Sequence, residues 1–141
     1  MPRSVRGTEV AMKFNGIGHI GMMIRELQPA LDFYCGKLGF RQITDNRATG
    51  SDHVSYFLQN GGIILELVTD PANRAPVPGV IDHISFFVDN VEEAMAELKK
   101  KGIEFETEDI LFDPYLYEHG EHFIMFHGPN GERLQLEHID M

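Results

Sequence analysis

Two histidines and two glutamates recur at matched places in the chain, and their side chains suit metal chemistry. His19 opens the stretch HIGMMI and His83 opens HISFFV, while Glu66 lies in LELVTD and Glu137 in LEHIDM. Imidazole nitrogens and carboxylate oxygens together favour a divalent transition metal, Ni, Co or Zn first and Fe or Mn next, with positions left for water or substrate. If the four side chains converge, the sequence predicts a metal site.

Glu66 is the least expected of the four residues because apolar side chains surround it. In the stretch IILELVTD, its neighbours on the same face of a strand are Ile64 and Val68. A buried carboxylate without a partner costs several kcal/mol, so Glu66 needs a proton, an ion pair or a metal. Glu137 is a weaker signal, since the alternation in RLQLEHI also fits a strand with one wet face. An ion pair of each glutamate with a basic side chain across a module boundary is the alternative.

An internal repeat explains why each half of the chain carries one histidine and one glutamate. HIGMMIRELQPALDFYCGKLGF begins at His19, and HISFFVDNVEEAMAELKKKGIEF begins at His83. When these histidines are aligned, apolar positions coincide, and with one gap Gly39 falls on Gly102. A duplicated module is the simplest account. Equivalent residues of two modules can then meet about a pseudo-two-fold axis, which is how the four side chains would converge.

Both halves have the same predicted order of elements, βαβββ, which makes the fold class α+β. Apolar residues at helical spacing follow an apolar strand, and Gly39 and Gly102 are expected to end the helices. Asn60-Gly61 and Asn130-Gly131 mark the last hairpin of each half. The predicted strands lie near 18–24, 40–44, 53–59 and 63–68, then near 82–88, 104–108, 122–127 and 133–139, and the helices near 27–38 and 91–98.

The length and the apolar content bound the domain organisation. At 141 residues and 43% hydrophobic content, the chain fits one compact unit. Residues 1–11 read as an N-terminal arm, ahead of a single domain at 12–141. We expect this domain to consist of a module at 12–70 and a module at 80–141, joined by the linker 71–79.

Charge and cysteine content limit the partners. The formal charge of -10, from 22 acidic and 12 basic residues, repels phosphate backbones and anionic lipids, so nucleic acid and membranes are not expected partners. Cys35 is the single cysteine, and no apolar signal segment stands near the N-terminus, which favours a cytoplasmic setting. With nucleic acid and membranes set aside, a small molecule is the expected partner.

The paired stretches resemble the vicinal oxygen chelate superfamily of glyoxalases, bleomycin- and fosfomycin-resistance proteins, methylmalonyl-CoA epimerase and extradiol dioxygenases. The resemblance covers about residues 14–140 and rests on GHIGMMI, FYCGKLGF and LELV, and on DHISFFV and GPNGERLQLEHI. It implies two modules that form a half-open mixed-sheet barrel around a metal cavity, and a homodimer. It also implies that His19, Glu66, His83 and Glu137 are the metal ligands, from one chain or from two.

This ligand set is most similar to that of bacterial glyoxalase I, or lactoylglutathione lyase. The resemblance implies a metal-dependent lyase or isomerase acting on a small chelating substrate, the hemithioacetal of an α-ketoaldehyde. The metal stabilises the enediolate formed when a neighbouring C–H proton leaves, and a glutamate takes and returns the proton. Glu137 is the first candidate for this base and Glu66 its counterpart. His53 and Tyr56, on a strand bordering the cavity, are candidate substrate contacts.

Other functions within the same superfamily stay open. A non-catalytic small-molecule or antibiotic-binding protein needs no metal, but gains nothing from two unpaired acids. An extradiol dioxygenase resembles this chain less, because it uses two histidines and one glutamate. A methylmalonyl-CoA epimerase tends to carry a second acid/base glutamate, and RQITDNRATGSDHVSYF contains no glutamate. The acidic, aromatic stretch EDILFDPYLYEHGEH is a candidate lid through Tyr115, Tyr117, His119 and His122.

Overall fold

The computed structural model describes residues 16–47, 50, 52, 54–72, 79 and 81–140. The predicted arm, most of the predicted linker and His53 lie outside these residues. The elements in chain order are β1 (Ile20–Ile24), α1 (Leu27–Leu31), the π-helix η1 (Asp32–Lys37), β2 (Arg41–Asp45), β3 (Ser55–Asn60), β4 (Ile63–Thr69), β5 (Ile84–Phe87), α2 (Val91–Lys100), β6 (Leu111–Asp113), β7 (Glu121–His127) and β8 (Arg133–Ile139).

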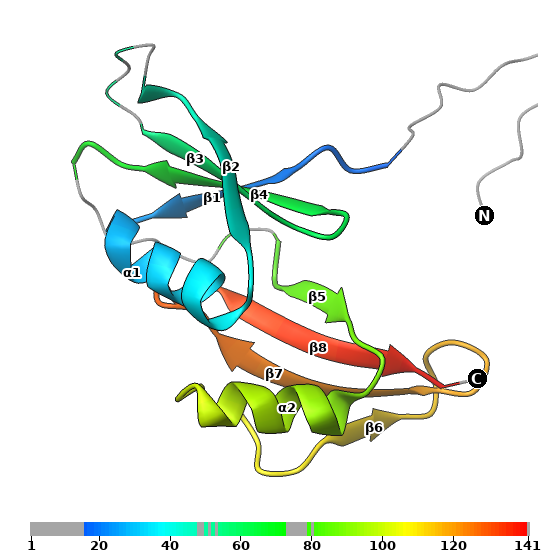
Figure 1. Cartoon of the computed structure of the whole chain (residues 1–141). Coiled ribbons are helices and arrows are strands. Elements are labelled where there is room, and N and C mark those ends of the chain that lie inside the picture. Colours follow the sequence, from blue (N-terminus) through cyan, green and yellow to red (C-terminus); the bar gives the residue numbers. More distant parts are fainter. Residues whose placement is uncertain are drawn as a thin grey trace, which may run out of the picture.

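Each half of the chain forms its own four-stranded mixed sheet. The first sheet has the order β1-β4-β3-β2 and the second has the order β5-β8-β7-β6. In both sheets the first strand pairs in parallel with the last, and the other pairs are antiparallel. The two sheets are splayed and do not close into a barrel within the chain (Figure 1). The predicted α+β fold of two βαβββ modules with a half-open arrangement is confirmed.

Each sheet is covered on one face by the helix of its own module. Buried Ala30 and Tyr34 pack α1 and η1 against the first sheet, and buried Val91, Met95 and Leu98 pack α2 against the second. This apolar stripe, spaced three or four residues apart, is the pattern from which the helices were predicted. No helix in the described part of the chain has the length and apolar character that a membrane span requires.

The helix ends also follow the sequence. The side chain of Asn90 caps α2 by accepting a hydrogen bond from the Glu93 amide at 2.9 Å. Gly39 and Gly102 have φ angles of 80° and 85°, the left-handed conformation that ends a helix and that glycine adopts without steric cost. The turn residue Gly61, with φ of 57°, closes the hairpin between β3 and β4 as predicted.

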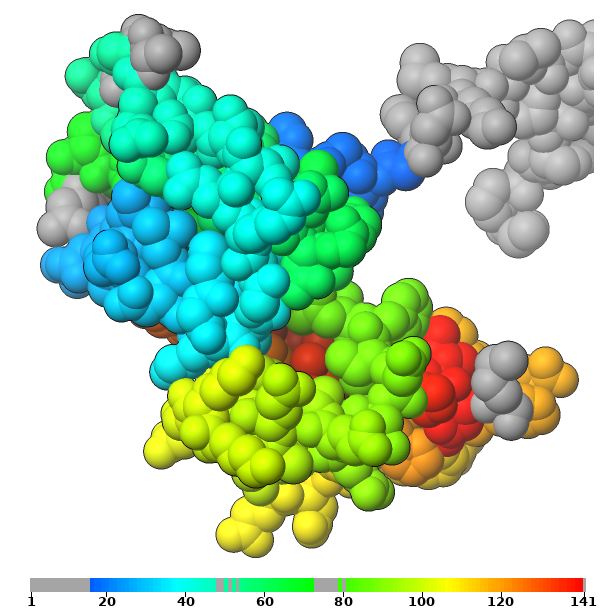
Figure 2. All heavy atoms as spheres, in the orientation of Figure 1, coloured from blue at the N-terminus to red at the C-terminus, as the bar shows by residue number. Residues whose placement is uncertain are grey.

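The two modules share one core along one side. Phe33 lies 6.4 Å from Phe126 between ring centroids, across the module boundary. Tyr34 donates a hydrogen bond to Glu132 at 2.9 Å, and burial, with this carboxylate, raises the pKa of the tyrosine. A cavity of about 280 Å³ lies at this junction, lined by apolar residues such as Phe40 and Phe86. Figure 2 shows the halves touching on one side, while the surface is hollowed between them on the other.

One predicted strand is wrong. Residues 104–108 form no strand, and Phe105 makes a single bridge to Phe126. The edge strand of the second sheet is instead β6, which pairs with the start of β7. Phe105 is the only apolar side chain in EFETE, so a longer pairing at this edge would bury charge without apolar gain. The loop that sequence analysis left without structure therefore contributes a strand.

Candidate functional site

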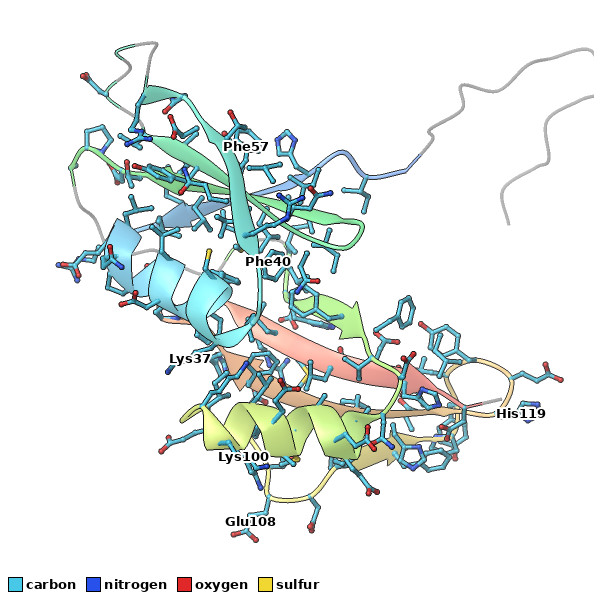
Figure 3. All side chains as sticks on the ribbon, viewed as in Figure 1. Lys37, Phe40, Phe57, Lys100, Glu108 and His119 are labelled. Carbon is cyan, nitrogen blue, oxygen red and sulfur yellow. The ribbon has the colours of Figure 1, made fainter. Side chains whose placement is uncertain are left out.

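His19 and Glu66 form the first half-site. His19 immediately precedes β1, and Glu66 lies in β4 opposite Gly21. The two side chains approach to 3.4 Å between His19 Nε2 and Glu66 Oε1. Phe57, paired with Glu66 across β3 and β4, packs its ring edge-on against the imidazole at 5.3 Å between centroids. Phe57 lies on the face of the sheet turned away from α1 (Figure 3), so this half-site is on the uncovered face.

We group His83 with Glu137 as the second half-site, in which the glutamate is more deeply enclosed. Glu137 lies in β8 and is only 7% exposed. Ser85 Oγ donates a hydrogen bond to Glu137 Oε2, and Tyr117 Oη donates one to Glu137 Oε1 at 3.3 Å. The wet-face interpretation of Glu137 is therefore wrong: the loop before β7 places Tyr117 over this strand. Its two oxygens are both hydrogen-bonded.

Glu121, at the start of β7, is a residue of this half-site that sequence analysis missed. It is 4% exposed, and its pKa is raised to about 7, first by burial and then by a hydrogen bond with Glu137 and the charges of Glu137 and Asp113. The positive charge of His83 acts in the opposite direction on the same pKa. Glu121 is therefore in contact with Glu137 and within electrostatic range of His83. The position of Glu121 next to Glu137 depends on the register of β7 against β8, which cannot be read from a single sequence.

Tyr117 is the one residue of the proposed lid that touches a candidate ligand. It has a φ of 60°, a conformation that costs a non-glycine residue about 1 kcal/mol or more and that clusters at functional sites. The charge of Glu137 is the main reason that the pKa of Tyr117 is raised. Tyr115 is exposed and His119 lies at the tip of the loop, away from the sheets (Figure 3). His122 pairs with Asp140 at 2.8 Å instead.

The described residues contain no group of three or more histidine, cysteine, aspartate or glutamate side chains placed to hold one metal ion. His19 and Glu66 are brought together, and His83 and Glu137 lie around Glu121, but the two half-sites do not merge within this chain. Each module thus presents one imidazole and one carboxylate. The histidines are equivalent in the repeat, but the glutamates are not: Glu66 pairs with Gly21, whereas Ser85, the counterpart of Gly21, pairs with Gln135, and Glu137 pairs with Phe87 two residues further on.

Comparison with known proteins places this arrangement in a family. A family model of the glyoxalase/bleomycin resistance protein/dioxygenase superfamily matches residues 16–136. This chain belongs to that superfamily. It is 34% identical over 131 residues to the uncharacterized protein YwkD of Bacillus subtilis (strain 168), a match that covers 89% of this chain and 98% of YwkD. The predicted membership of the superfamily is confirmed.

Solved structures of the superfamily agree with the fold. The glyoxalase family protein from Enterococcus faecalis aligns with a TM-score of 0.74 at 28% identity, covering 89% of this chain and 99% of that one. The fosfomycin resistance protein FosX from Mesorhizobium loti aligns with a TM-score of 0.65 at 16% identity, covering 88% and 91%. The second likeness concerns the fold alone.

Members of this superfamily commonly use divalent metals, and the first half-site has a spacing that fits one. Two ligand atoms bound to one zinc-like ion at about 2.1 Å lie roughly 3.0–3.4 Å apart, for ligand angles between square and tetrahedral. The 3.4 Å between His19 Nε2 and Glu66 Oε1 falls at the end of this range. In the second half-site, imidazole and carboxylate supply the same donor types.

The remaining candidates have other surroundings. Tyr56 packs against the core cluster, with the Arg47 guanidinium 5.6 Å from its ring centroid. Burial raises the pKa of Cys35, which disfavours the nucleophilic thiolate. His138 lies with its Nδ1 3.3 Å from the Val88 carbonyl oxygen. Of the residues in contact with Glu137, sequence analysis named Tyr117 and missed Ser85 and Glu121.

Proposed function

We propose that this member of the superfamily is a cytoplasmic, metal-dependent lyase or isomerase of the glyoxalase I type, acting on the hemithioacetal of an α-ketoaldehyde. The observation that carries the proposal is the pair of half-sites, each with one imidazole and one carboxylate on a sheet of its own. His19, Glu66, His83 and Glu137 would hold a divalent ion, with Ni, Co or Zn expected. Such an ion supplies Lewis-acid stabilisation of the enediolate that forms when the substrate loses its proton.

The proposal includes a homodimer in which the first half-site of one chain meets the second half-site of its partner. The site is incomplete in the described part of a single chain, and a second copy would complete it. Met23 and Phe87 come four residues after His19 and His83 and are 47% and 71% exposed. Apolar side chains beside each half-site are the surface that a second copy would cover. A two-fold arrangement completes both sites at once.

The proton transfer is assigned to the second half-site. Glu137 is proposed as the base, because it is enclosed where water is scarce and has acidic and hydroxyl groups around it. Glu121, with a pKa of about 7, is able to hold a proton near neutral pH beside this carboxylate. Tyr117 and Ser85 orient the two oxygens of Glu137. Glu66 has an imidazole as its neighbour, which supports a role as ligand.

Metal content per chain is the first test. Protein purified without chelators or an affinity-metal column is subjected to elemental analysis, for wild type, His19→Ala and His83→Ala. The expected result is about one Ni, Co, Zn, Fe or Mn per chain, lost in both variants. If the wild type takes up none of these ions after incubation, the metal proposal fails and a non-catalytic binding protein becomes the better reading.

Mixed dimers test the sharing of the site. One chain carries His19→Ala with Glu66→Gln, and the other carries His83→Ala with Glu137→Gln. If sites are shared, the mixed dimer has one intact site made of two unaltered half-sites, and it recovers metal binding and turnover of methylglyoxal with a thiol. If each site lies within one chain, the mixture stays as inactive as either parent. Tags on the two chains allow the mixed dimer to be isolated.

A further inference from the structure

Three charged side chains, Asp82, Arg133 and Glu106, form a connected line that ends on His83. His83 Nδ1 lies 2.7 Å from Asp82 Oδ2, and Arg133 Nη1 lies 3.3 Å from the same oxygen. Arg133 also grips Glu106 with two hydrogen bonds of 2.8 Å, from Nε to Oε2 and from Nη2 to Oε1. This parallel, two-point contact is the strongest geometry for an arginine and a carboxylate. We call Asp82, Arg133 and Glu106 the carboxylate clamp.

The residues of the carboxylate clamp come from three separate parts of the second module. Asp82 precedes β5, Arg133 begins β8, and Glu106 lies in the segment before β6. The Glu106 amide donates to the Met125 carbonyl at 2.9 Å, so the backbone of this segment is fixed to β7. His127 Nε2 lies 2.7 Å from Glu106 Oε2 and holds the carboxylate from a second side. The clamp therefore rests on the sheet and not on a free loop.

We infer that the carboxylate clamp fixes the orientation and the tautomer of His83, so that its Nε2 is presented to the metal centre. An ionised carboxylate accepts hydrogen bonds and donates none, so the proton of a neutral His83 must sit on Nδ1, facing Asp82. The lone pair then lies on Nε2. A ligand histidine that donates its other nitrogen to a carboxylate is held in this way in many metal sites. The inference rests on the proposed metal site.

In the part of the chain that the structure describes, no carboxylate contacts Nδ1 of His19 in the way that Asp82 contacts His83. In the repeat, Gly18 occupies the place of Asp82, directly before His19. His19 turns its Nε2 to Glu66 and meets the edge of Phe57. A Cβ added to Gly18 would meet nothing within 4 Å, so an aspartate fits at this position. Asp82 and Arg133 are accordingly positioning residues of the second half-site.

Two measurements test the inference on the full-length protein. The tautomer of His83 is read from ¹⁵N chemical shifts of the metal-free protein, and affinity for Ni²⁺ or Zn²⁺ from competition with a chromophoric chelator. The variants are Asp82→Asn, Arg133→Gln and Gly18→Asp. The control is Asp140→Asn, because Asp140 makes the same contact to a histidine outside the half-sites, at 2.8 Å from His122 Nδ1. Thermal unfolding without metal establishes that each variant folds.

Asp82→Asn is expected to lower metal affinity about tenfold and to remove the preference of His83 for a proton on Nδ1. Arg133→Gln is expected to do the same to a smaller extent. Gly18→Asp should raise affinity and shift His19 toward the Nδ1–H tautomer, while Asp140→Asn changes neither quantity. If Asp82→Asn leaves the tautomer or the affinity unchanged in a protein that binds metal, the inference is overturned. If the wild type binds no metal, the proposed function fails, and the tautomer alone decides whether Asp82 orients His83.

Discussion

The two histidines occupy equivalent places in the repeat, but the two half-sites are built differently. Among the described residues, Glu66 approaches His19, whereas Glu137 accepts hydrogen bonds from Ser85 and Tyr117 and is hydrogen-bonded with Glu121. The same asymmetry holds for the histidines, since Asp82 contacts His83 and a glycine precedes His19. A duplicated module thus supplies the ligand types twice but the supporting hydrogen bonds once.

Under the proposed function, this difference favours Glu137 as the base and Glu66 as a metal ligand. A base must stand in a fixed place, and must have neighbours that accept or hold the proton it takes. Glu137 has such neighbours. Glu66, with an imidazole alone, is suited to hold a metal and not to pass a proton. Substitutions that exchange single features between the half-sites test whether the two glutamates have different roles.

The largest effect is expected from the two glutamates themselves. Glu137→Gln should lower kcat about 10²- to 10⁴-fold, the usual contribution of a positioned base. Glu66→Gln should chiefly weaken metal binding and lower kcat less once metal is saturating. The measurement is turnover of methylglyoxal with several thiols at saturating metal, beside thermal unfolding of each variant.

Either of two results would contradict this division. If Glu137→Gln turns over as fast as a measurably active wild type, Glu137 is not the base. If Glu66→Gln shows the larger loss of kcat while Glu137→Gln mainly loses metal, the roles of the half-sites are exchanged.

A smaller effect is expected from Glu121 on the stability of the metal-free protein. Its pKa is raised from 4.5 to about 7, so the folded chain binds the proton more tightly than the unfolded chain does. The stability gained in this way is complete below about pH 4.5 and is lost as the pH rises through about 7. Glu121→Gln should remove this loss and raise the free energy of unfolding at pH 8 by about 3 kcal/mol.

Urea unfolding with a chelator present, between pH 4.5 and 8, measures this difference. Glu108→Gln is the matched control, because Glu108 is exposed and its substitution removes the same charge from the chain. If the free energy of unfolding varies with pH in the same way in the wild type and in Glu121→Gln, ionisation of the Glu121 carboxyl does not destabilise the fold. The control should follow the wild-type profile.

Sequence reasoning reached the fold because the repeat, the apolar periodicity and the glycines are local signals. The ligand types of both half-sites were also accessible, since His19 and Glu66 each stand within an apolar run. The error at 104–108 arose because one aromatic residue among acids does not sustain a strand. Glu121 required the register of β7 on β8, which depends on long-range pairing.

The support around each ligand was still harder to predict. Ser85 shares a strand face with His83, which made it a neighbour in principle, but its contact with Glu137 crosses from β5 to β8. Tyr117 reaches Glu137 only through a backbone in the left-handed conformation. No intrinsic preference of tyrosine foretells that conformation, because the surrounding structure imposes it.

The smallest effect is expected from the strand residue that differs between the half-sites. Gly21 stands where the second module has Ser85. A Cβ at Gly21 would lie 3.5 Å from Glu66 Oε1, an ordinary contact, so Gly21→Ser brings a hydroxyl within reach of this carboxylate. The new hydrogen bond, worth about 0.5–1.5 kcal/mol, should hold Glu66 in place and tighten metal binding roughly two- to tenfold.

Ser85→Ala is the reverse change and should weaken metal binding by a similar factor, because Glu137 loses one of the two hydroxyls that orient it. Metal titrations of both variants and of Gly21→Ala decide the point, since Gly21→Ala stiffens the strand without adding a donor. If Gly21→Ser and Gly21→Ala change the affinity equally, the gain comes from the backbone. In that case a hydroxyl beside the glutamate does not tighten metal binding, and Tyr117 and Glu121 are the contacts of Glu137 that distinguish the second half-site.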